Sequence, residues 1–250
     1  MVGIKKTTVF LVSLTAFFFS VIVLTPASLV YTAFQDKIIK ELPDLSLKKI
    51  EGTIWEGKSK IKFRQFPIVD AAWQLTPLSL VTLTVKSTVT VMAVGLQGKF
   101  EMSVNREGTS IKILNAIIED QYLNEITMPY GLDLSGDINL LATHLYFDKQ
   151  WLTKADGELT WGGGIVHIQT PERIHTANLP ALQGHLSLVD NIFRLDVKES
   201  DKTMMQIYIK PDGWAKVAIN YALIDLINIP LPIAAIANED PAIVLEEKIL

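Results

Sequence analysis

The chain has 250 residues, which is enough to bury a sizeable hydrophobic core in one or two domains. Its formal net charge of −4 argues against a nucleic-acid-binding protein, because such proteins usually present a basic face. It contains no cysteine, which excludes a disulfide framework and a thiolate metal site.

The N-terminus carries the most apolar stretch of the chain. Lys5 and Lys6 precede an uncharged run over residues 7–35, and the sequence predicts a transmembrane anchor over residues 7–30, with its N-terminus in the cytoplasm. A cleaved signal peptide is the alternative, because Thr25-Pro26-Ala27 offers small residues at a cleavage site. In either case we expect the residues after about 35 to lie outside the cytoplasm. With the anchor retained, the chain has two parts, an N-terminal cytoplasmic tip and anchor over 1–30 and a β-rich domain over 31–250.

After a short amphipathic helix that ends at Pro43, a glycine-bracketed tryptophan segment begins the rest of the chain. Gly52-Thr53-Ile54-Trp55-Glu56-Gly57 is predicted to be a short strand with Thr53 and Trp55 on one face. A second tryptophan strand, with Trp73, is stopped by Pro77, and a short helix is expected over 77–81.

From Leu47 onward the apolar residues recur with a period of two. In the clearest case, residues 82–91, one face carries Leu83, Val85, Val89 and Val91, which predicts a half-buried antiparallel strand. Similar strands, including one continuing from Leu132 to Leu140, alternate with turn signals such as Asp156-Gly157.

This pattern predicts a mainly β fold in which residues 44–222 form one extended, curved antiparallel meander. Three arrangements would bury the apolar face of the meander: a sandwich, a barrel, or an open trough lined by residues such as the four named above. A short helix is expected near 117–125. Residues 227–250, interrupted by prolines, are predicted to be an irregular C-terminal cap or a partner-binding segment.

The residues that most often perform chemistry form no recognisable site. The four histidines, His144, His167, His175 and His185, lack the spacing of a helical zinc site. Residues 162–164 are three glycines, but a strand follows them, which favours a bulge or a close backbone approach over a phosphate-binding loop. We therefore predict no catalytic residue, no metal and no cofactor.

The tryptophans admit two interpretations. Trp55, Trp73 and Trp161 are expected to be core anchors, and the alternative places some of them on an interaction surface. Trp151 and Trp214 lie beside charged or turn residues, and we expect them to be more exposed.

With these motifs the chain resembles the type II secretion system protein N family (general secretion pathway protein N). The resemblance rests on four elements: the N-terminal anchor; the Gly-Thr-x-Trp-x-Gly element; the tryptophan and Leu-x-Pro step at Trp73 and Pro77; and the later strands. In those strands the matching residues are Gly131, Gly136, Gly157 and Trp161. It implies a fold similar to the AsmA-like class, whose curved sheets form apolar troughs implicated in lipid handling.

The resemblance also implies a function. It is that of a non-enzymatic, single-pass component of the bacterial inner membrane with a periplasmic sheet, which acts in the export of folded proteins across the outer membrane. The implied partners are the assembly-platform proteins of the secretion machine and the lipid bilayer, with no nucleic acid. The alternative function is a periplasmic lipid-binding or lipid-transfer protein that holds an acyl chain in a curled sheet.

Overall fold

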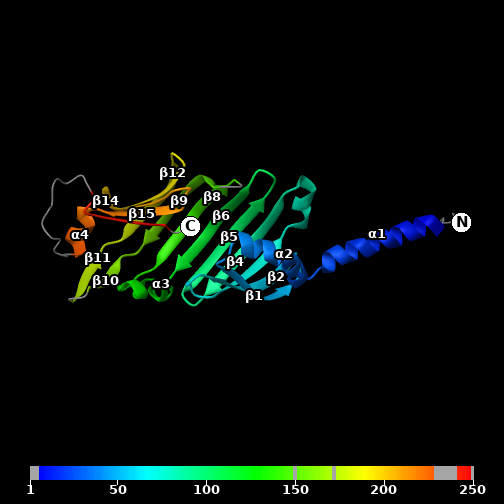
Figure 1. Cartoon of the computed structure of the whole chain (residues 1–250), viewed down its shortest axis with the longest axis horizontal. Helices are drawn as coiled ribbons and strands as arrows, with labels where there is room; N and C mark the ends of the chain where they lie inside the picture. Colours follow the sequence, from blue (N-terminus) through cyan, green and yellow to red (C-terminus); the bar gives the residue numbers. More distant parts are fainter. Residues whose placement is uncertain (1–5, 149–150, 171–172, 228–240, 249–250) are drawn as a thin grey trace.

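The computed structural model describes residues 6–148, 151–170, 173–227 and 241–248, and it is dominated by β-strands (Figure 1). The described helices are α1 (Lys6–Leu24), α2 (Ala27–Glu41), α3 (Asp120–Thr127) and α4 (Tyr221–Ile227), with 3-10 helices η1 (Pro77–Thr82) and η2 (Met128–Tyr130). The described strands are β1 (Leu45–Gly52), β2 (Glu56–Phe63), β3 (Val69–Leu75), β4 (Val85–Ala93), β5 (Leu96–Val104), β6 (Thr109–Ile118), β7 (Leu132–Leu134), β8 (Ile138–Phe147), β9 (Leu152–Trp161), β10 (Gly164–Gln169), β11 (Ile174–Leu179), β12 (Leu182–Val189), β13 (Ile192–Glu199), β14 (Lys202–Ile209), β15 (Trp214–Ile219) and β16 (Ile243–Lys248).

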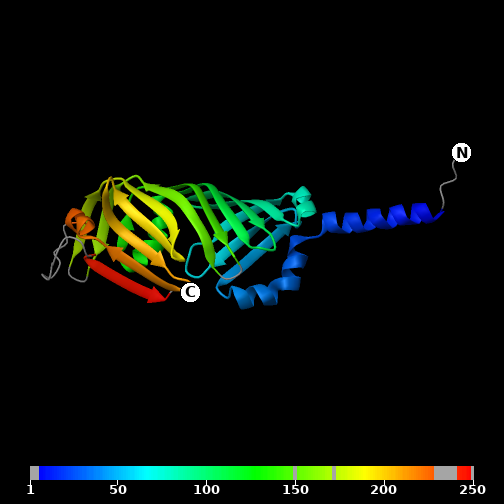
Figure 2. The same ribbon diagram turned by 90° about the horizontal axis from the view of Figure 1, so that it is seen from above.

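Helix α1 projects away from the sheet, and α2 turns back along it (Figure 2). The two helices are separated at Pro26, which cannot donate a helical hydrogen bond and disfavours helical geometry at Thr25. Among the described residues, no helix has both the length and the apolar character needed to cross a membrane. The single transmembrane helix predicted over residues 7–30 is therefore not confirmed, and the described part of this stretch is two helices.

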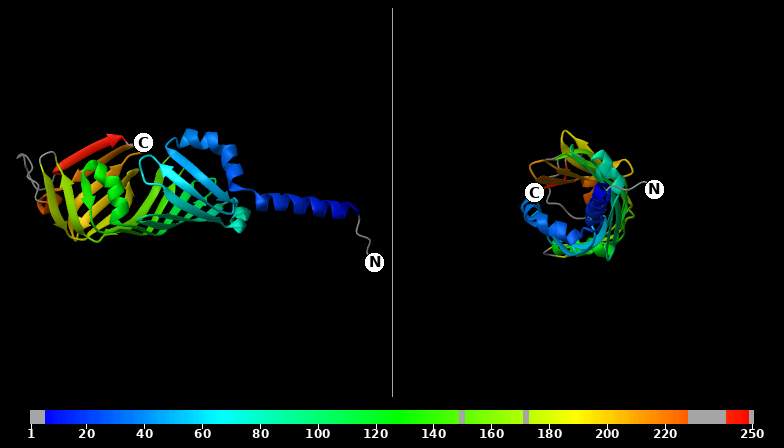
Figure 3. Two further views of the ribbon diagram at one scale, coloured as in Figure 1. Left: turned by 90° about the horizontal axis from the view of Figure 1, so that it is seen from below. Right: turned by 90° about the vertical axis from the view of Figure 1, so that its right-hand side faces the viewer.

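Thirteen of the described strands form one antiparallel sheet in the order β1-β2-β3-β4-β5-β6-β8-β9-β12-β13-β14-β15-β16. Nearly every strand pairs with its neighbours in sequence, as in a meander, and the sheet curls about its long axis (Figure 3). The prediction of a mainly β, antiparallel fold is confirmed.

The two faces of this sheet differ in polarity, because side chains alternate along each strand. One row of directly opposed residues lies on what we call the apolar face: Gly57, Trp73, Val89, Phe100, Ile113 and Thr143, and further on Leu186, Leu195, Ile207 and Val217. The adjacent row, on the polar face, includes Lys58, Thr90, Lys99 and Asn115, and later Glu158, His185 and Asp196.

Among the described residues, a second layer covers the apolar face in only one half of the main sheet. A second sheet, β11-β10-β7, and helix α4 pack on it beyond β8. The resulting core contains Trp161, Val166, Ala177, Leu179, Leu182, Val197, Met204, Leu223 and Ile227. Over β3–β6, in contrast, residues such as Val89, Phe100 and Ile113 are only half-buried. The sheet is thus closed at the end distant from α1 and open nearer to it.

Several predicted boundaries are wrong. The strand expected over 82–91 begins only at Val85, because η1 extends to Thr82 and Leu83 adopts a left-handed conformation with φ of 54°. The strand expected from Leu132 to Leu140 is divided between β7 of the second sheet and β8 of the main sheet. Asp156-Gly157, predicted to be a turn, lies inside β9.

The other short helices and the C-terminus also differ in detail from the prediction. The helix expected over 117–125 begins at Asp120, because β6 continues to Ile118. The helix expected over 77–81 is confirmed as η1. In the segment 227–250, predicted to be an irregular cap, residues 243–248 form β16, which pairs with β15. Residues 228–240 and 249–250 lie outside the described residues.

Candidate functional site

Thr53, Ile54 and Trp55 form the tight turn that joins β1 to β2, while Gly52 ends β1 and Glu56 begins β2. The prediction of a strand at this segment is therefore wrong for the three central residues. We call the whole segment the Gly52–Gly57 turn. Gly52 ends β1 with φ of 90°, a conformation that costs glycine little and other residues considerably more. Thr53 then closes the turn, since its N–H donates to the carbonyl oxygen of Glu56 at 2.8 Å. The hydroxyl oxygen of Thr53 accepts hydrogen bonds from the N–H groups of Trp55 at 3.2 Å and Glu56 at 3.3 Å.

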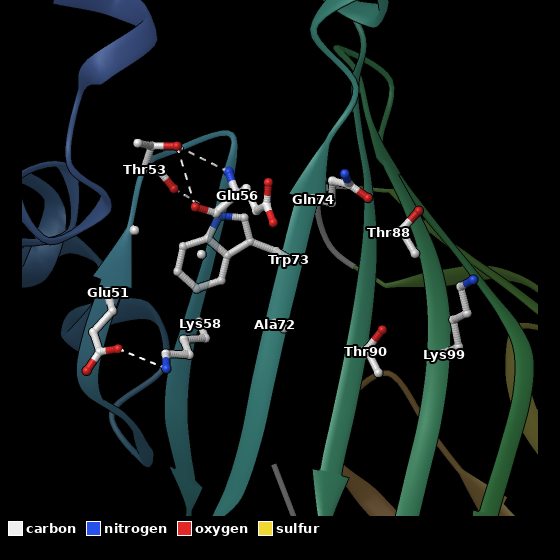
Figure 4. A pocket seen from close by; sticks show the side chains of 12 residues that line it. Glu51, Thr53, Glu56, Lys58, Ala72, Trp73, Gln74, Thr88, Thr90 and Lys99 are labelled. Carbon is white, nitrogen blue, oxygen red and sulfur yellow. Dashed lines mark hydrogen bonds and ion pairs between the residues drawn. The ribbon is translucent and has the colours of Figure 1, made fainter.

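Trp73 fixes this turn to the neighbouring strand. Its indole reaches from β3 over β2 (Figure 4), and the indole Nε1 donates to the carbonyl oxygen of Thr53 at 3.3 Å. A Cβ atom at Gly57 would collide with the Trp73 ring and with the carbonyl oxygen of Glu51. Glycine at this position is therefore required for the indole to lie flat over β2.

The outer side of the turn contacts the end of α1. Trp55 Nε1 donates to the carbonyl oxygen of Ile22 at 3.0 Å, and Ile54 N–H donates to the carbonyl oxygen of Thr25 at 3.1 Å. Pro26 and Thr53 form an isolated antiparallel bridge. Both indole N–H groups thus donate to backbone carbonyl oxygens: that of Trp55 to α1, and that of Trp73 to the turn itself.

A pocket of about 740 Å³ lies beside this turn (Figure 4). Its lining includes Thr88, Thr90 and Lys99 of β4 and β5, and an ion pair between Lys58 Nζ and Glu51 Oε2 at 3.1 Å. Both side chains of this pair are largely exposed, so the pair contributes little to stability. The pocket has the form of a polar surface groove.

A second cluster of predicted motif residues lies where the two sheets meet. Gly131 and Gly136 flank β7, and Trp161 ends β9. The Trp161 indole donates to the carbonyl oxygens of Ser135 at 3.2 Å and Gly136 at 3.3 Å. Gly157 lies opposite the fully buried Thr143, whose side chain occupies the space that a Cβ atom would need. Pro77, the remaining motif residue, begins η1.

The predicted tryptophan environments are confirmed in part. Trp161 is 8% exposed and belongs to the core, whereas Trp55 and Trp73 are half-buried. Trp214 is 43% exposed, as expected, and Trp151 is half-buried. The exposed fractions differ because, in the part of the chain that the structure describes, a second layer packs only on the half of the apolar face near Trp161.

The residues predicted to line an apolar trough are not all together. Val85, Val89 and Val91 lie on the apolar face of β4. Leu83 lies outside the strand, after η1, and is 75% exposed. That the three valines line an apolar trough stays a prediction. Leu83 does not lie on the same face as these valines.

The four histidines are dispersed over β8, β10, β11 and β12. His167 contacts Thr176 at 2.9 Å, and His175 accepts a hydrogen bond from Arg173 Nε at 3.2 Å. In the part of the chain that the structure describes, no group of three or more His, Cys, Asp or Glu side chains could hold a metal ion.

One contact that sequence reasoning missed is the pair Ser110–His144. The Ser110 hydroxyl oxygen lies 2.8 Å from His144 Nε2, on the polar face of β6 and β8. A serine next to an imidazole resembles a nucleophile with its base, and Asp156 stands opposite His144 in the strand register. The two residues are 34 positions apart, so no sequence motif could have indicated the contact.

This pair lacks the rest of a hydrolytic site. None of the described ion pairs joins Asp156 to His144, so the imidazole has no carboxylate to orient it. Ser110 and His144 lie on adjacent strands of the main sheet, in which most backbone N–H groups take part in the strand pairing. The contact is explained as a hydrogen bond between two strands.

The fold and its motif clusters together define the class of protein. It is one curled antiparallel sheet with a projecting apolar helix, in which tryptophan and glycine residues hold the joints between elements. The model of the family "Type II secretion system (T2SS), protein N" matches residues 43–222, which is most of the chain and extends from just before β1 to the start of α4. The chain belongs to this family. Comparison with curated proteins and with solved structures gives no match.

Proposed function

We propose that the protein is a non-enzymatic accessory component of the type II secretion system at the bacterial inner membrane. The curled sheet lies in the periplasm, contacts the assembly-platform proteins of the machine, and assists the export of folded proteins across the outer membrane. The observation that carries this proposal is the family match, which covers nearly the whole main sheet. The absence of a metal-binding cluster among the described residues and the incomplete Ser110–His144 pair support a non-enzymatic role.

The proposed membrane attachment rests on α1. Its side chains from Val9 to Leu24 are exposed, and they include large apolar residues such as Phe10, Phe18 and Phe19. Exposed apolar side chains in such number are costly in water, and a lipid environment would remove this cost. Lys5 precedes α1 in the sequence and Lys6 is its first residue, as expected for a cytoplasmic N-terminus.

Deletion of the gene tests the secretion role. We expect exported enzymes to accumulate in the periplasm and to decrease in the medium, and we expect the intact gene to restore their export. Enzyme activity in the two fractions is the measurement. Unchanged export after deletion, in cells whose secretion machine is otherwise functional, would contradict the proposal.

Cell fractionation tests the location. We expect the full chain to sediment with inner membranes and to resist extraction by alkaline carbonate. In intact spheroplasts, protease should degrade the sheet region. Recovery of the full chain in the soluble fraction would argue against membrane attachment without deciding the secretion role.

A second candidate function is the holding of a lipid acyl chain, and one observation favours it. Over β3–β6 no described element forms a second layer on the apolar face, and Trp73, Val89, Phe100 and Ile113 remain half-buried. This row contains no charged side chain, which suits a hydrocarbon chain. The covered end beyond β8 would close such a groove.

Mass spectrometry of the purified protein under native conditions tests this candidate, with a matched pair of variants. Val89→Asp places a charge on the apolar face, and Thr90→Asp places the same charge on the polar face one residue further on. We expect bound lipid in the unmodified protein and in Thr90→Asp, and its loss in Val89→Asp. If the unmodified protein carries no lipid after extraction in mild detergent, this candidate is wrong.

A further inference from the structure

We propose that the Gly52–Gly57 turn is a joint that receives the C-terminal end of α1 and fixes the direction in which the sheet leaves this helix. The inference concerns the position of two parts of the chain and does not depend on the secretion role. It gives the glycine-bracketed tryptophan segment a purpose that neither its composition nor the family match supplies.

The C-terminal end of α1 needs hydrogen-bond donors. The last carbonyl groups of an α-helix have no partner within the helix, and they need donors from elsewhere. Ile22 lies in the last turn of α1, and its carbonyl oxygen accepts from Trp55 Nε1 at 3.0 Å. Three residues later, Thr25 accepts from Ile54 N–H at 3.1 Å. Two consecutive residues of the turn therefore bind two groups at the helix exit.

The turn itself is held rigidly. Its two ends belong to paired strands, and Thr53 bonds to Trp55 and Glu56 inside it. On the sheet side, Leu75 N–H donates to the carbonyl oxygen of Trp55 at 2.6 Å, and Trp73 Nε1 donates to Thr53. The turn is thus tied to β3 as well as to β1 and β2, so it moves with the sheet.

Helix α1 makes few other contacts that could fix its direction. Helix α2 packs along β1, whereas α1 has no comparable packing against another described element. It extends away from the body of the molecule (Figures 1 and 2). The contacts of the turn with Ile22, Thr25 and Pro26 are therefore the attachment that determines the angle between the helix and the sheet.

Distance measurements between two spin labels test the joint directly. The chain has no cysteine, so Ser20→Cys in α1 and Gln97→Cys on β5, both at exposed positions, give a doubly labelled full-length protein. Electron–electron double resonance in detergent should give one narrow distance distribution. Trp55→Phe keeps an aromatic ring but removes the N–H donor, and it should broaden this distribution.

Trp151→Phe is the matched control. Trp151 Nε1 also donates to a backbone carbonyl, that of Asn191, at 3.0 Å, but far from α1 in the chain. This variant should leave the distribution narrow. Equal broadening in both variants, or none in Trp55→Phe, would overturn the inference.

A second change covers the case in which Trp55→Phe fails to fold. Insertion of three glycines between Thr25 and Pro26 leaves Ile22 and Thr25 able to bind the turn but lengthens the covalent link from α1 to α2. If the turn fixes the helix, the distance distribution should stay narrow, with unchanged sheet content by circular dichroism. A broad distribution after the insertion would show that the covalent link sets the angle, and it would overturn the joint. Neither distance measurement depends on a secretion assay. The joint can therefore be wrong while the proposed function is right, and the proposed function can be wrong while the joint is right.

Discussion

At the scale of single residues, glycine and tryptophan act in pairs. Gly57 provides the space that the Trp73 indole occupies, and Trp161 donates to the carbonyl oxygen of Gly136. Trp55 differs because its partner is a helix end 33 residues away. The motif residues are therefore explained by packing and hydrogen bonding, without any chemistry.

Gly57→Ala is the sharpest test of this pairing. The new methyl group must displace the Trp73 ring or the backbone of Glu51, and we expect a loss of about 1–3 kcal/mol in the free energy of unfolding. Gly162→Ala is the control, because no atom lies within 4 Å of its added Cβ, and it should change stability by less than about 0.5 kcal/mol. Urea unfolding followed by circular dichroism measures both, and equal losses would show that the Trp73 contact is unimportant.

Trp161→Ala should be among the most destabilising truncations. It removes a core side chain that is 8% exposed and two hydrogen bonds, for an expected cost of about 3–5 kcal/mol. Trp214→Ala, at a position 43% exposed, should cost about 1 kcal/mol or less. A similar shift of the urea midpoint in both variants would contradict the assignment of the core to the half of the sheet beyond β8.

Tyr122 should make the stability depend on alkaline pH. Burial, together with the nearby negative charge of Glu125, raises the pKa of the Tyr122 hydroxyl above its ordinary value of 10.0. Its stabilising contribution is fully present below pH 10.0 and is lost as the pH rises through the folded-state pKa, since the unfolded state ionises first. Tyr122→Phe should reduce the loss of stability between pH 9 and pH 11, measured by urea unfolding; an identical pH profile would exclude the effect.

At the scale of elements, the strands were the part that the sequence predicted best. A period of two is a direct consequence of side-chain alternation, so most of β4 could be located from it. The errors fall where a distant contact decides the structure. Thr53, Ile54 and Trp55 favour strands by composition, but contacts with α1 and β3 hold them in a turn. Gly157 favours a turn by composition, but it lies within a strand, where the missing side chain leaves room for Thr143.

Hydrogen exchange should rank the strands by their place in the sheet. Strands β6, β8 and β9 are paired on both sides, whereas β1 and β16 are at the two edges. We expect the central amides to exchange much more slowly than those of the edge strands, because edge strands open without disrupting the rest. Mass spectrometry of peptic fragments gives this order, and fast exchange in β8 would contradict the sheet order.

At the scale of the whole molecule, the two halves of the sheet differ in how they are completed. The half beyond β8 has its own second layer, and the half nearer α1 leaves its apolar face half-exposed. The sequence indicated an apolar face but could not show which part is covered, because the cover comes from β7, β10, β11 and α4, far apart in the chain. The contacts between the Gly52–Gly57 turn and α1 could not be predicted either, because they also join residues that are far apart in the chain.

The strand order has a further consequence, for the way in which the chain folds. Because β1 to β6 and β12 to β16 are each neighbours in both sequence and space, most strand pairs close only a short loop of chain. Short loops cost little entropy, and folds rich in local pairings reach their native state faster than those that depend on distant ones. The sheet can therefore grow one hairpin at a time from its N-terminal edge as the chain is made. A slow step should be the pairing of β9 with β12, because β10 and β11 lie between them in the chain and belong to the other sheet.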